Sequence, residues 1–322
     1  MKENVPSKTV EKPAYAIVIH GGAGYIQANN FSDENKEKYL NALDTALTIG
    51  ETILKDGGSS IEAVEKTINY MENNPLFNAG KGAVFTHDGQ NEMDASIMYG
   101  KDQNAGAVGG VRTVKNPISL ARKVMEESDH VMMVGKGAEQ FGMTQNIEMV
   151  DTTYFFVQDR WNALQNMLKS EEEKEKTRLS EDPIDTKHGT VGCVALDKDG
   201  NLCAGTSTGG MTNKKYDRVG DSPIIGAGTF ADNATCGVSC TGHGEYFIRY
   251  TVARDVAALM EYGNYTLAEA ADIIVNDKLK EKGGNGGLIA IDKDGNIAMP
   301  FNTSSMFRGY VTPDQKEIEI FK

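Results

Sequence analysis

The sequence has little that would place it in a membrane or on nucleic acid. Its apolar runs, such as residues 14–19, fall far short of the roughly 20 residues that a membrane-spanning helix needs. There is no cluster of basic residues, and the formal net charge is −13 over 322 residues, which argues against a nucleic-acid or anionic-membrane binder. Residues 1–13 are polar and lack the apolar core of a signal peptide. We therefore expect a cytoplasmic protein, or a periplasmic one if a signal peptide has been removed.

Cysteine and proline are also scarce. The four cysteines include no Cys-x-x-Cys pair, and no histidine lies at the spacing of a zinc ligand. Cys236 and Cys240 lie in a strand-like segment, where they are too far apart to form a disulfide with each other, so we expect buried free thiols. Against 8 prolines there are 35 glycines, which predict tight turns and close approaches of the backbone.

Hydrophobic periodicity predicts alternating groups of strands and helices. An apolar run at residues 15–19 reads as a buried strand that feeds a glycine loop at His20–Gly24. Two segments of almost identical sequence, residues 196–202 and 291–297, predict hairpins around Asp-Gly turns in one layered core. Helices are expected over residues 34–55, 118–128, 136–145 and 245–262, and others begin at Ser59 and Thr266 with capping-box sequences. This order predicts an α+β protein in which helices cover layers of sheet.

A charged segment, residues 161–188, separates the two halves of the chain. Its first part has helical character, and residues from about 170 to 189 read as a mobile linker. An apolar strand begins directly after it, at Thr190. A threonine at a chain N-terminus carries its own base, because its α-amine has a pKa near 8 and is partly neutral at pH 7. Gly189 would tolerate the strained geometry of a cleavage at the Gly189–Thr190 bond, although a linker followed by an ordinary strand explains these residues equally well.

Further polar residues follow Thr190 in glycine-rich stretches. The segments 206–210 and 239–245 combine threonine, serine and glycine at the ends of predicted strands, which suits a pocket where backbone amides approach a ligand. Arg218 and Asp221 lie close together with opposite charges. They would hold the α-carboxylate and the α-ammonium group of an amino acid, or form an ordinary surface ion pair.

In combination and in order, these motifs resemble the plant-type L-asparaginase / isoaspartyl peptidase family of N-terminal-nucleophile (Ntn) hydrolases. The resemblance covers nearly the whole chain, from His20 to Thr303. It is carried by His20–Gly24, Pro75–Gly80, His188–Gly192, Thr206–Asn213, Arg218–Pro223 and Ser239–Gly242.

The resemblance implies a four-layer αββα sandwich, cut by the protein itself into an α subunit (residues 1–189) and a β subunit (residues 190–322) that form one folded domain. Thr190 would be the nucleophile, and the cleaved protomers would form a homodimer. Thr208 and Thr241 would support the nucleophile, Thr241 and the Gly242 amide would form the oxyanion hole, and Asn78 would lie beside Thr190. Arg218 would bind the substrate α-carboxylate, and Asp221 with the Gly244 carbonyl would bind its α-ammonium group.

The resemblance also implies a structural sodium ion and no cofactor for catalysis. The ion would be held by main-chain oxygens, as a hard cation prefers. These oxygens would belong to Met71, Glu72, Asn74, Phe77, Ala79 and Lys81.

Alternative enzymes share some of these motifs. Glycosylasparaginases and threonine aspartases usually carry Asp before the nucleophile, so Gly189 favours the asparaginase and isoaspartyl peptidase branch. His243 stands where smaller residues are common in the family, which leaves substrate preference open.

Residues 205–209 also match the Gly-x-Ser-x-Gly nucleophile elbow, with Ser207 as nucleophile and His243 as base of an esterase. The segment after Ser207 lacks helical periodicity, which counts against this alternative. A calcium-binding protein that is not an enzyme is also excluded, because the Asp-Gly turns do not continue into the spaced acidic ligands of an EF-hand loop.

Overall fold

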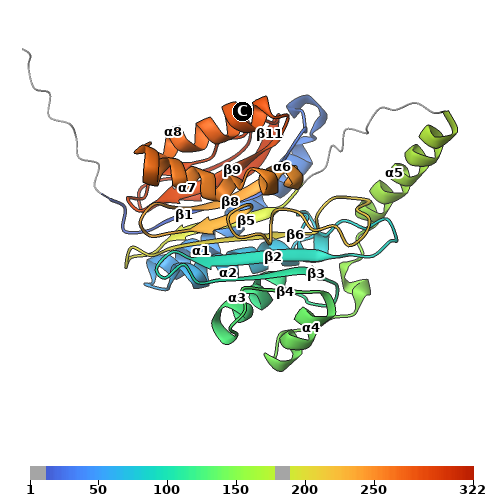
Figure 1. Cartoon of the computed structure of the whole chain (residues 1–322). Helices are drawn as coiled ribbons and strands as arrows, with labels where there is room; N and C mark the ends of the chain where they lie inside the picture. Colours follow the sequence, from blue (N-terminus) through green and yellow to red (C-terminus); the bar gives the residue numbers. More distant parts are fainter. Residues whose placement is uncertain (1–11, 178–188) are drawn as a thin grey trace, which may run out of the picture.

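The computed structural model describes residues 12–177 and 189–322, and they form two facing β-sheets with helices outside them (Figure 1). The larger sheet has the order β12-β11-β1-β5-β6-β2-β3-β4, and the smaller has the order β10-β9-β8-β7. All strand pairs are antiparallel except β3 with β4. The strands of the larger sheet are β1 (Ala16–Gly24), β2 (Met93–Tyr99), β3 (Ala105–Val111), β4 (Met132–Val134), β5 (Val191–Leu196), β6 (Leu202–Thr208), β11 (Ser305–Val311) and β12 (Lys316–Phe321). Those of the smaller sheet are β7 (Thr229–Ala231), β8 (Cys236–Gly242), β9 (Gly286–Asp292) and β10 (Ile297–Ala298).

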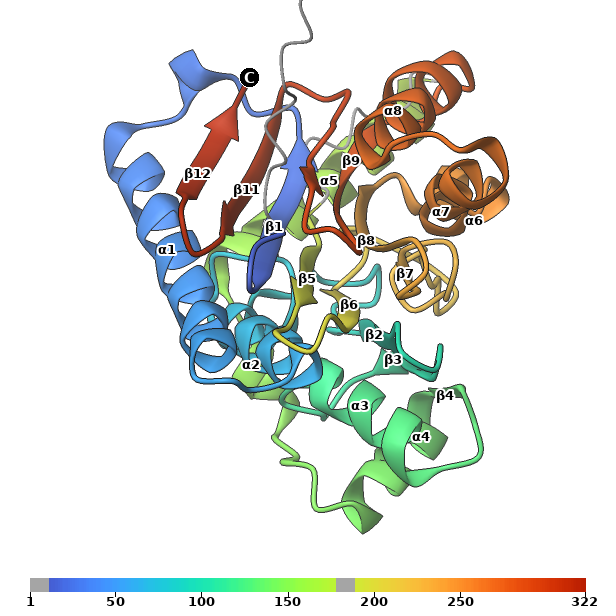
Figure 2. The ribbon, with the colours of Figure 1, turned by 90° about the vertical axis from the view of Figure 1, so that its left-hand side faces the viewer.

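Helices pack on the outer face of each sheet. Figure 2 shows α1 running beside β12, β11 and β1, while α2 packs on β5 and β6, and α3 on β2 and β3. On the other side, α7 packs on β8 and α8 on β9, whereas α5 extends away from the sheets (Figure 1). The α-helices are α1 (Asp33–Lys55), α2 (Ser60–Asn73), α3 (Pro117–Glu127), α4 (Gly135–Thr144), α5 (Gln158–Thr177), α6 (Gly244–Arg249), α7 (Val252–Gly263) and α8 (Leu267–Asp272). Short 3-10 turns cover Ala28–Asn30, Gly80–Gly82 and Thr152–Phe155, and a π-helical segment, Ile273–Leu279, continues α8.

The position of β1 between two hydrophobic cores explains why residues 15–19 form an unbroken apolar run. Ile17 and Ile19 point into the core beneath α1 and α2, whereas Ala16 and Val18 point into the core between the two sheets. Both faces are therefore buried, so neither set of alternating positions can be polar. The sequence thus places the protein correctly in the α+β class, with helices covering layers of sheet.

Two local predictions were wrong. The expected glycine loop at His20–Gly24 is the second half of β1, paired with β11 and interrupted by a bulge between His20 and Gly22. The expected single helix over residues 245–262 is two helices, α6 and α7. Thr251 separates them, because it adopts the left-handed conformation with φ of 46°. An α-helix cannot continue through a residue in that conformation.

The predicted helix starts and hairpins are confirmed. Ser59 accepts a hydrogen bond from the Glu62 amide at the start of α2, and Thr266 with Glu269 forms a complete capping box at α8. The two Asp-Gly turns have the same internal hydrogen bonds, since Asp197 and Asp292 each accept from backbone amides two and four residues later. One hairpin belongs to each sheet, and β5 of the first contacts β9 of the second.

Other expectations are settled only in part. All four cysteines are free and buried, as expected. Over the described residues, no helix is both long and apolar enough to cross a bilayer. Residues 170–177 continue helix α5, and residues 178–188 of the predicted linker lie outside the described part of the chain.

Candidate active site

The Gly189–Thr190 peptide lies directly before β5, where three elements converge on the Gly189 carbonyl. Asn78 Nδ2 donates a hydrogen bond to the Gly189 oxygen at 2.7 Å, and Thr208 Oγ1 donates to the same oxygen at 3.2 Å. The backbone of β1 closes the other side, because a Cβ placed on Gly22 would lie 2.8 Å from Gly189 Cα. Two donors on one carbonyl oxygen would stabilise negative charge that develops there.

The hydroxyl of Thr190 completes this arrangement. Thr190 is 7% exposed, and its Oγ1 donates to Thr208 Oγ1 at 3.1 Å. Since Thr208 has one hydroxyl hydrogen and gives it to Gly189, its oxygen must accept from Thr190 and from the Gly210 amide. The hydroxyl of Thr190 is thus held next to the carbonyl that precedes it.

Asn78 is fixed by the loop after α2. Its Oδ1 accepts from the Val84 amide at 3.0 Å, and its Nδ2 also donates to the Gly210 carbonyl at 2.8 Å. Its own carbonyl accepts from the Gly209 amide. These bonds fix which end of the Asn78 amide faces Gly189, the residue directly before Thr190.

A small pocket opens on this centre and brings most of the predicted site residues together. Three of the predicted catalytic and substrate-binding residues, Asn78, Thr241 and Gly244, are absent from its lining. Thr241 is 1% exposed, and its Oγ1 accepts from the Ala23 amide at 3.2 Å. The pocket is lined by Gly189, Thr190, Thr208, Gly210, Met211, Arg218, Gly220, Asp221, Ser222 and Gly242.

Arg218 and Asp221 face this pocket from the loop between β6 and β7, and they meet at Gly244. A Cβ on Gly244 would lie 2.8 Å from Arg218 Nη2 and 2.9 Å from Asp221 Oδ1, so only glycine leaves room for both side chains. Asp221 is buried, and its Oδ2 has no hydrogen-bond partner among the described residues. Burial raises the pKa of Asp221 to about 7, against the opposing effect of Arg218. The interpretation as a surface ion pair is therefore wrong.

Glu245 is a site residue that the sequence reasoning missed. Both of its carboxylate oxygens accept from Arg218, with Nε at 2.9 Å and Nη2 at 2.8 Å. His243 Nε2 lies 3.2 Å from the same carboxylate. Hydrogen bonds from His243 and Arg218 hold the pKa of Glu245 well below its usual range. Its position in the sequence could have indicated a role, because Glu245 directly follows Gly244, a predicted substrate-binding residue, at the start of α6.

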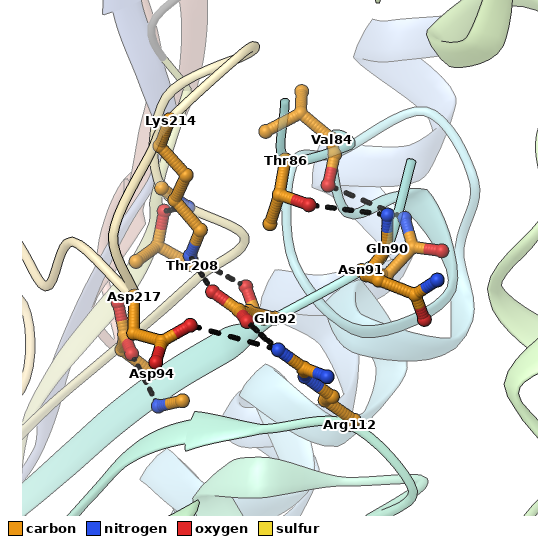
Figure 3. Close-up of polar contacts among 12 residues, drawn as sticks. Val84, Thr86, Gln90, Asn91, Glu92, Asp94, Arg112, Thr208, Lys214 and Asp217 are labelled. Atoms are coloured by element: carbon orange, nitrogen blue, oxygen red, sulfur yellow. Dashed lines mark hydrogen bonds and ion pairs between the residues drawn. The ribbon is translucent and has the colours of Figure 1, made fainter. Parts of the chain in front are cut away.

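A buried lysine, Lys214, was also missed, and Figure 3 shows its side chain reaching toward Glu92. Lys214 Nζ donates to the Glu92 carbonyl at 2.9 Å and lies 3.9 Å from the Glu92 carboxylate, which also binds Arg112. A Cβ on Gly210 would lie 3.1 Å from Lys214 Nζ. Burial lowers the pKa of Lys214, and the nearby carboxylates of Asp94 and Glu92 oppose that effect. This network fixes the loop that carries Gly210 and Met211.

Ser207 is not placed to act as the nucleophile of an esterase. It lies within β6, on no strand-to-helix elbow, and its Oγ donates to Glu72 Oε1 at 2.7 Å on the helix side of the sheet. Its neighbours Thr206 and Thr208 make their contacts on the other face. The match at residues 205–209 is therefore a coincidence of strand sequence.

Comparison with known proteins agrees with this geometry. A family model described as asparaginase matches residues 13–320, so the chain belongs to the asparaginase family. It is 49% identical to the isoaspartyl peptidase of Escherichia coli over 296 residues, covering 91% of this chain and 92% of that protein. It is 43% identical to the isoaspartyl peptidase/L-asparaginase of Rattus norvegicus over 292 residues, covering 90% and 84%. It is 40% identical to the plant-type L-asparaginase of Pyrococcus furiosus over 309 residues, covering 94% and 98%.

Proposed function

We propose that this chain is a threonine amidohydrolase that cuts itself between Gly189 and Thr190 and then hydrolyses isoaspartyl peptides and L-asparagine, releasing L-aspartate. The observation that carries the proposal is the pair of donors, Asn78 and Thr208, on the carbonyl that precedes the Thr190 hydroxyl. The high identity to isoaspartyl peptidases and L-asparaginases supports the substrate class.

Self-cleavage would proceed through an ester. Thr190 Oγ attacks the Gly189 carbonyl carbon, and the donors on the Gly189 oxygen stabilise the oxyanion. The C–N bond then breaks, the nitrogen takes a proton, and Gly189 is left as an ester on Thr190 Oγ. Water hydrolyses this ester, which frees the Gly189 carboxylate and the Thr190 hydroxyl. The product is a Thr190 residue with a free α-amine.

Substrate hydrolysis would use the same hydroxyl. The α-amine of Thr190 accepts the Oγ proton, and Oγ attacks the side-chain amide carbon of asparagine or of a β-aspartyl peptide. The Gly242 amide, which lines the pocket, would stabilise the oxyanion together with the Thr241 hydroxyl, whose oxygen accepts from Ala23 and whose hydrogen is left to donate. Asp221, with the Gly244 carbonyl, would hold the substrate ammonium group, and Arg218 would hold the carboxylate. Ammonia or a peptide amine leaves with a proton, and water hydrolyses the remaining β-aspartyl ester.

The proposal assigns the two sheets and their helices to the αββα sandwich of the Ntn hydrolases. Cleavage then divides one folded domain into residues 1–189 and 190–322. In this arrangement β1 lies between β11 and β5, so strands from both products share one sheet. We also propose that the cleaved protomers form a homodimer.

Carbonyl oxygens in and before the loop after α2 support a proposed sodium site. A Cβ on Gly80 would lie 2.4 Å from the Glu72 carbonyl oxygen, and one on Gly82 would lie 1.9 Å from that of Phe77, so these carbonyls turn inward. The Glu72 side chain is committed elsewhere, to Ser207, Ile118 and Asn116. We therefore propose that main-chain oxygens would hold the ion and stiffen the loop that presents Asn78; these oxygens belong to Met71, Glu72, Asn74, Phe77, Ala79 and Lys81.

A substrate comparison tests the proposed activity. Purified protein is incubated with β-aspartyl-leucine, L-asparagine and the α-linked isomer aspartyl-leucine, and L-aspartate release is measured. We expect hydrolysis of the first two substrates and none of the third, because the aspartyl residue of an α-linked peptide lacks the free α-carboxylate that Arg218 is proposed to bind. Hydrolysis of the α-linked peptide at a comparable rate, or of no β-linked substrate, would overturn the proposal.

A further inference from the structure

A continuous chain of buried polar contacts runs between the two sheets, from the carbonyl of Thr190 to the carbonyl of Ser222. Its members come from five different strands, and each is 0% exposed. We call it the inter-sheet chain, and it consists of His20 on β1, Ser239 on β8, Thr206 on β6, Thr229 on β7 and Ser96 on β2.

Every contact in the inter-sheet chain has hydrogen-bond length. His20 Nδ1 lies 2.9 Å from the Thr190 oxygen, and His20 Nε2 lies 3.1 Å from Ser239 Oγ. Ser239 Oγ lies 2.7 Å from Thr206 Oγ1, which lies 2.5 Å from Thr229 Oγ1. Ser96 Oγ lies 2.8 Å from Thr229 Oγ1 and 2.6 Å from the Ser222 oxygen.

The chemistry of its end gives the inter-sheet chain a direction. The Thr190 carbonyl can only accept, so His20 must carry its hydrogen on Nδ1. Burial lowers the pKa of His20 to about 3, so the ring is neutral and Nε2 accepts from the Ser239 hydroxyl. Ser239 then accepts from Thr206, and Thr206 accepts from Thr229. Ser96 has one hydroxyl hydrogen, which it gives either to Thr229 or to the Ser222 carbonyl, so the directed part of the inter-sheet chain runs from Thr190 to Thr229. The hydrogen-bonding state of each member thus depends on the next.

Gly192 makes room for this arrangement. It lies between His20 and Thr206 across the strands β1, β5 and β6. A Cβ at this position would lie 2.1 Å from Ser239 Oγ and 2.2 Å from His20 Nε2. The glycine two residues after Thr190 is therefore required by the inter-sheet chain, since any other residue would separate His20 from Ser239.

The members of the inter-sheet chain lie next to the groups of the active site. Thr206 is two residues before Thr208 on β6, and Ser239 is two residues before Thr241 on β8. At the far end, Ser222 directly follows Asp221 and lines the same pocket. The inter-sheet chain thus ties the backbone of the nucleophile to the loop that would bind the substrate ammonium group.

We infer that the inter-sheet chain positions Thr190 against the substrate clamp, with His20, Ser239 and Thr206 as positioning residues for the reaction. This inference rests on the proposed role of Thr190 as nucleophile. Apolar packing would hold the two sheets together without these five side chains, and a buried polar network whose members all have hydrogen-bond partners fixes one arrangement of its neighbours more strictly than apolar packing does.

Replacing one hydroxyl in the middle tests the inference. Thr206→Val removes the hydroxyl at nearly constant shape, and Thr206→Ser keeps it. Ser207→Ala is the control, because it removes a buried, hydrogen-bonded hydroxyl of the next residue, which contacts Glu72 outside the inter-sheet chain. We expect Thr206→Val to slow self-cleavage and to lower kcat for L-asparagine by about 10- to 100-fold, the loss that slight misplacement of a reacting group causes. KM should change less than about 3-fold. Tm should fall in both Thr206→Val and Ser207→Ala, because each loses buried hydrogen bonds, whereas Ser207→Ala should keep its kcat and Thr206→Ser should retain most of it.

An unchanged kcat in Thr206→Val, or a loss that Thr206→Ser fails to restore, would overturn the inference. Activity in Thr190→Ala would instead overturn the proposed nucleophile, so the two failures are distinguishable. Should Thr206→Val fail to fold, the wild-type protein still decides the matter by nitrogen NMR of its ¹⁵N-labelled histidines. One buried histidine should be neutral from pH 5 to 8 with its hydrogen on Nδ1, and its bare Nε2 signal should shift in Ser239→Ala. A buried histidine with its hydrogen on Nε2 would contradict the chain.

Discussion

The side-chain amide of Asn78 donates a 2.7 Å hydrogen bond to the carbonyl oxygen of Gly189, the residue immediately before Thr190. The two residues are 111 positions apart in the sequence, and the loop after α2 brings them together. Asn78 therefore acts on the bond to be cut, and a prediction about self-cleavage follows from this contact.

Asn78→Asp should slow self-cleavage by about 10²- to 10³-fold, because it replaces an oxyanion donor by a group that cannot donate when ionised. The uncut fraction is measured on denaturing gels over time after synthesis. Asn91→Asp is the matched control, because Asn91 is also buried and donates to two carbonyls of the same loop, Ala83 and Val84, but not to Gly189. Equal processing of both variants would mean that the contact with Gly189 has no role in cleavage.

Glu245→Gln should raise KM for L-asparagine by about 10-fold with little change in kcat. The Glu245 carboxylate orients the Arg218 guanidinium through two charge-assisted bonds and leaves its remaining N–H groups for the substrate carboxylate. Glu261→Gln is the control, since Glu261 pairs with Arg254 at similar exposure. A fall in KM would show instead that Glu245 competes with the substrate for Arg218.

The buried carboxylate of Asp221 predicts opposite effects on stability and on binding. Its folded-state pKa is raised to about 7, so its contribution to stability is present at low pH and is lost as pH rises through about 7. Asp221→Asn should therefore be more stable than the wild type at pH 8, by about 1–3 kcal/mol, and the difference should shrink at pH 5. Urea unfolding of both proteins at pH 8 and pH 5 measures this difference in the free energy of unfolding.

The wild-type enzyme should show the matching change in binding. KM for L-asparagine should fall as pH rises through about 7, because only ionised Asp221 pairs with the substrate ammonium group. Asp221→Asn should raise KM and remove this dependence. A variant that is less stable at pH 8 than at pH 5 relative to the wild type would contradict the assignment of the raised pKa to burial.

Ser207→Ala should leave the activity intact and lower stability. Its hydroxyl bonds Glu72, whose buried carboxyl group has a pKa raised to about 7 by desolvation, and the loss of one such bond costs about 1 kcal/mol or more. Thermal unfolding and L-asparagine hydrolysis measure the two effects. A stably folded Ser207→Ala protein without activity would restore Ser207 as a candidate nucleophile.

The sequence predicts the outline of this site because its motifs lie in short segments. Turn sequences and helical periodicity place α1, α2 and both hairpins, and the clamp residues Arg218 and Asp221 are close together in the chain. The contacts of His20 and Glu245 could not be predicted, since each joins elements that meet only when the sheets stack. The contact between Lys214 and Glu92 depends on the pairing of β6 with β2, two strands that are far apart in the sequence. The glycines that follow His20 suggested a loop, because glycine weakens a strand. They instead lie within β1, where Gly22 lets the strand backbone approach Gly189 closely.

Intact-mass spectrometry of the purified protein and of Thr190→Ala tests the central claim most directly. We predict two wild-type fragments, one ending at Gly189 and one beginning at Thr190, and a single uncut, inactive chain for Thr190→Ala. Two such fragments from Thr190→Ala, or a fully active wild-type protein in which the Gly189–Thr190 bond remains intact, would contradict the account.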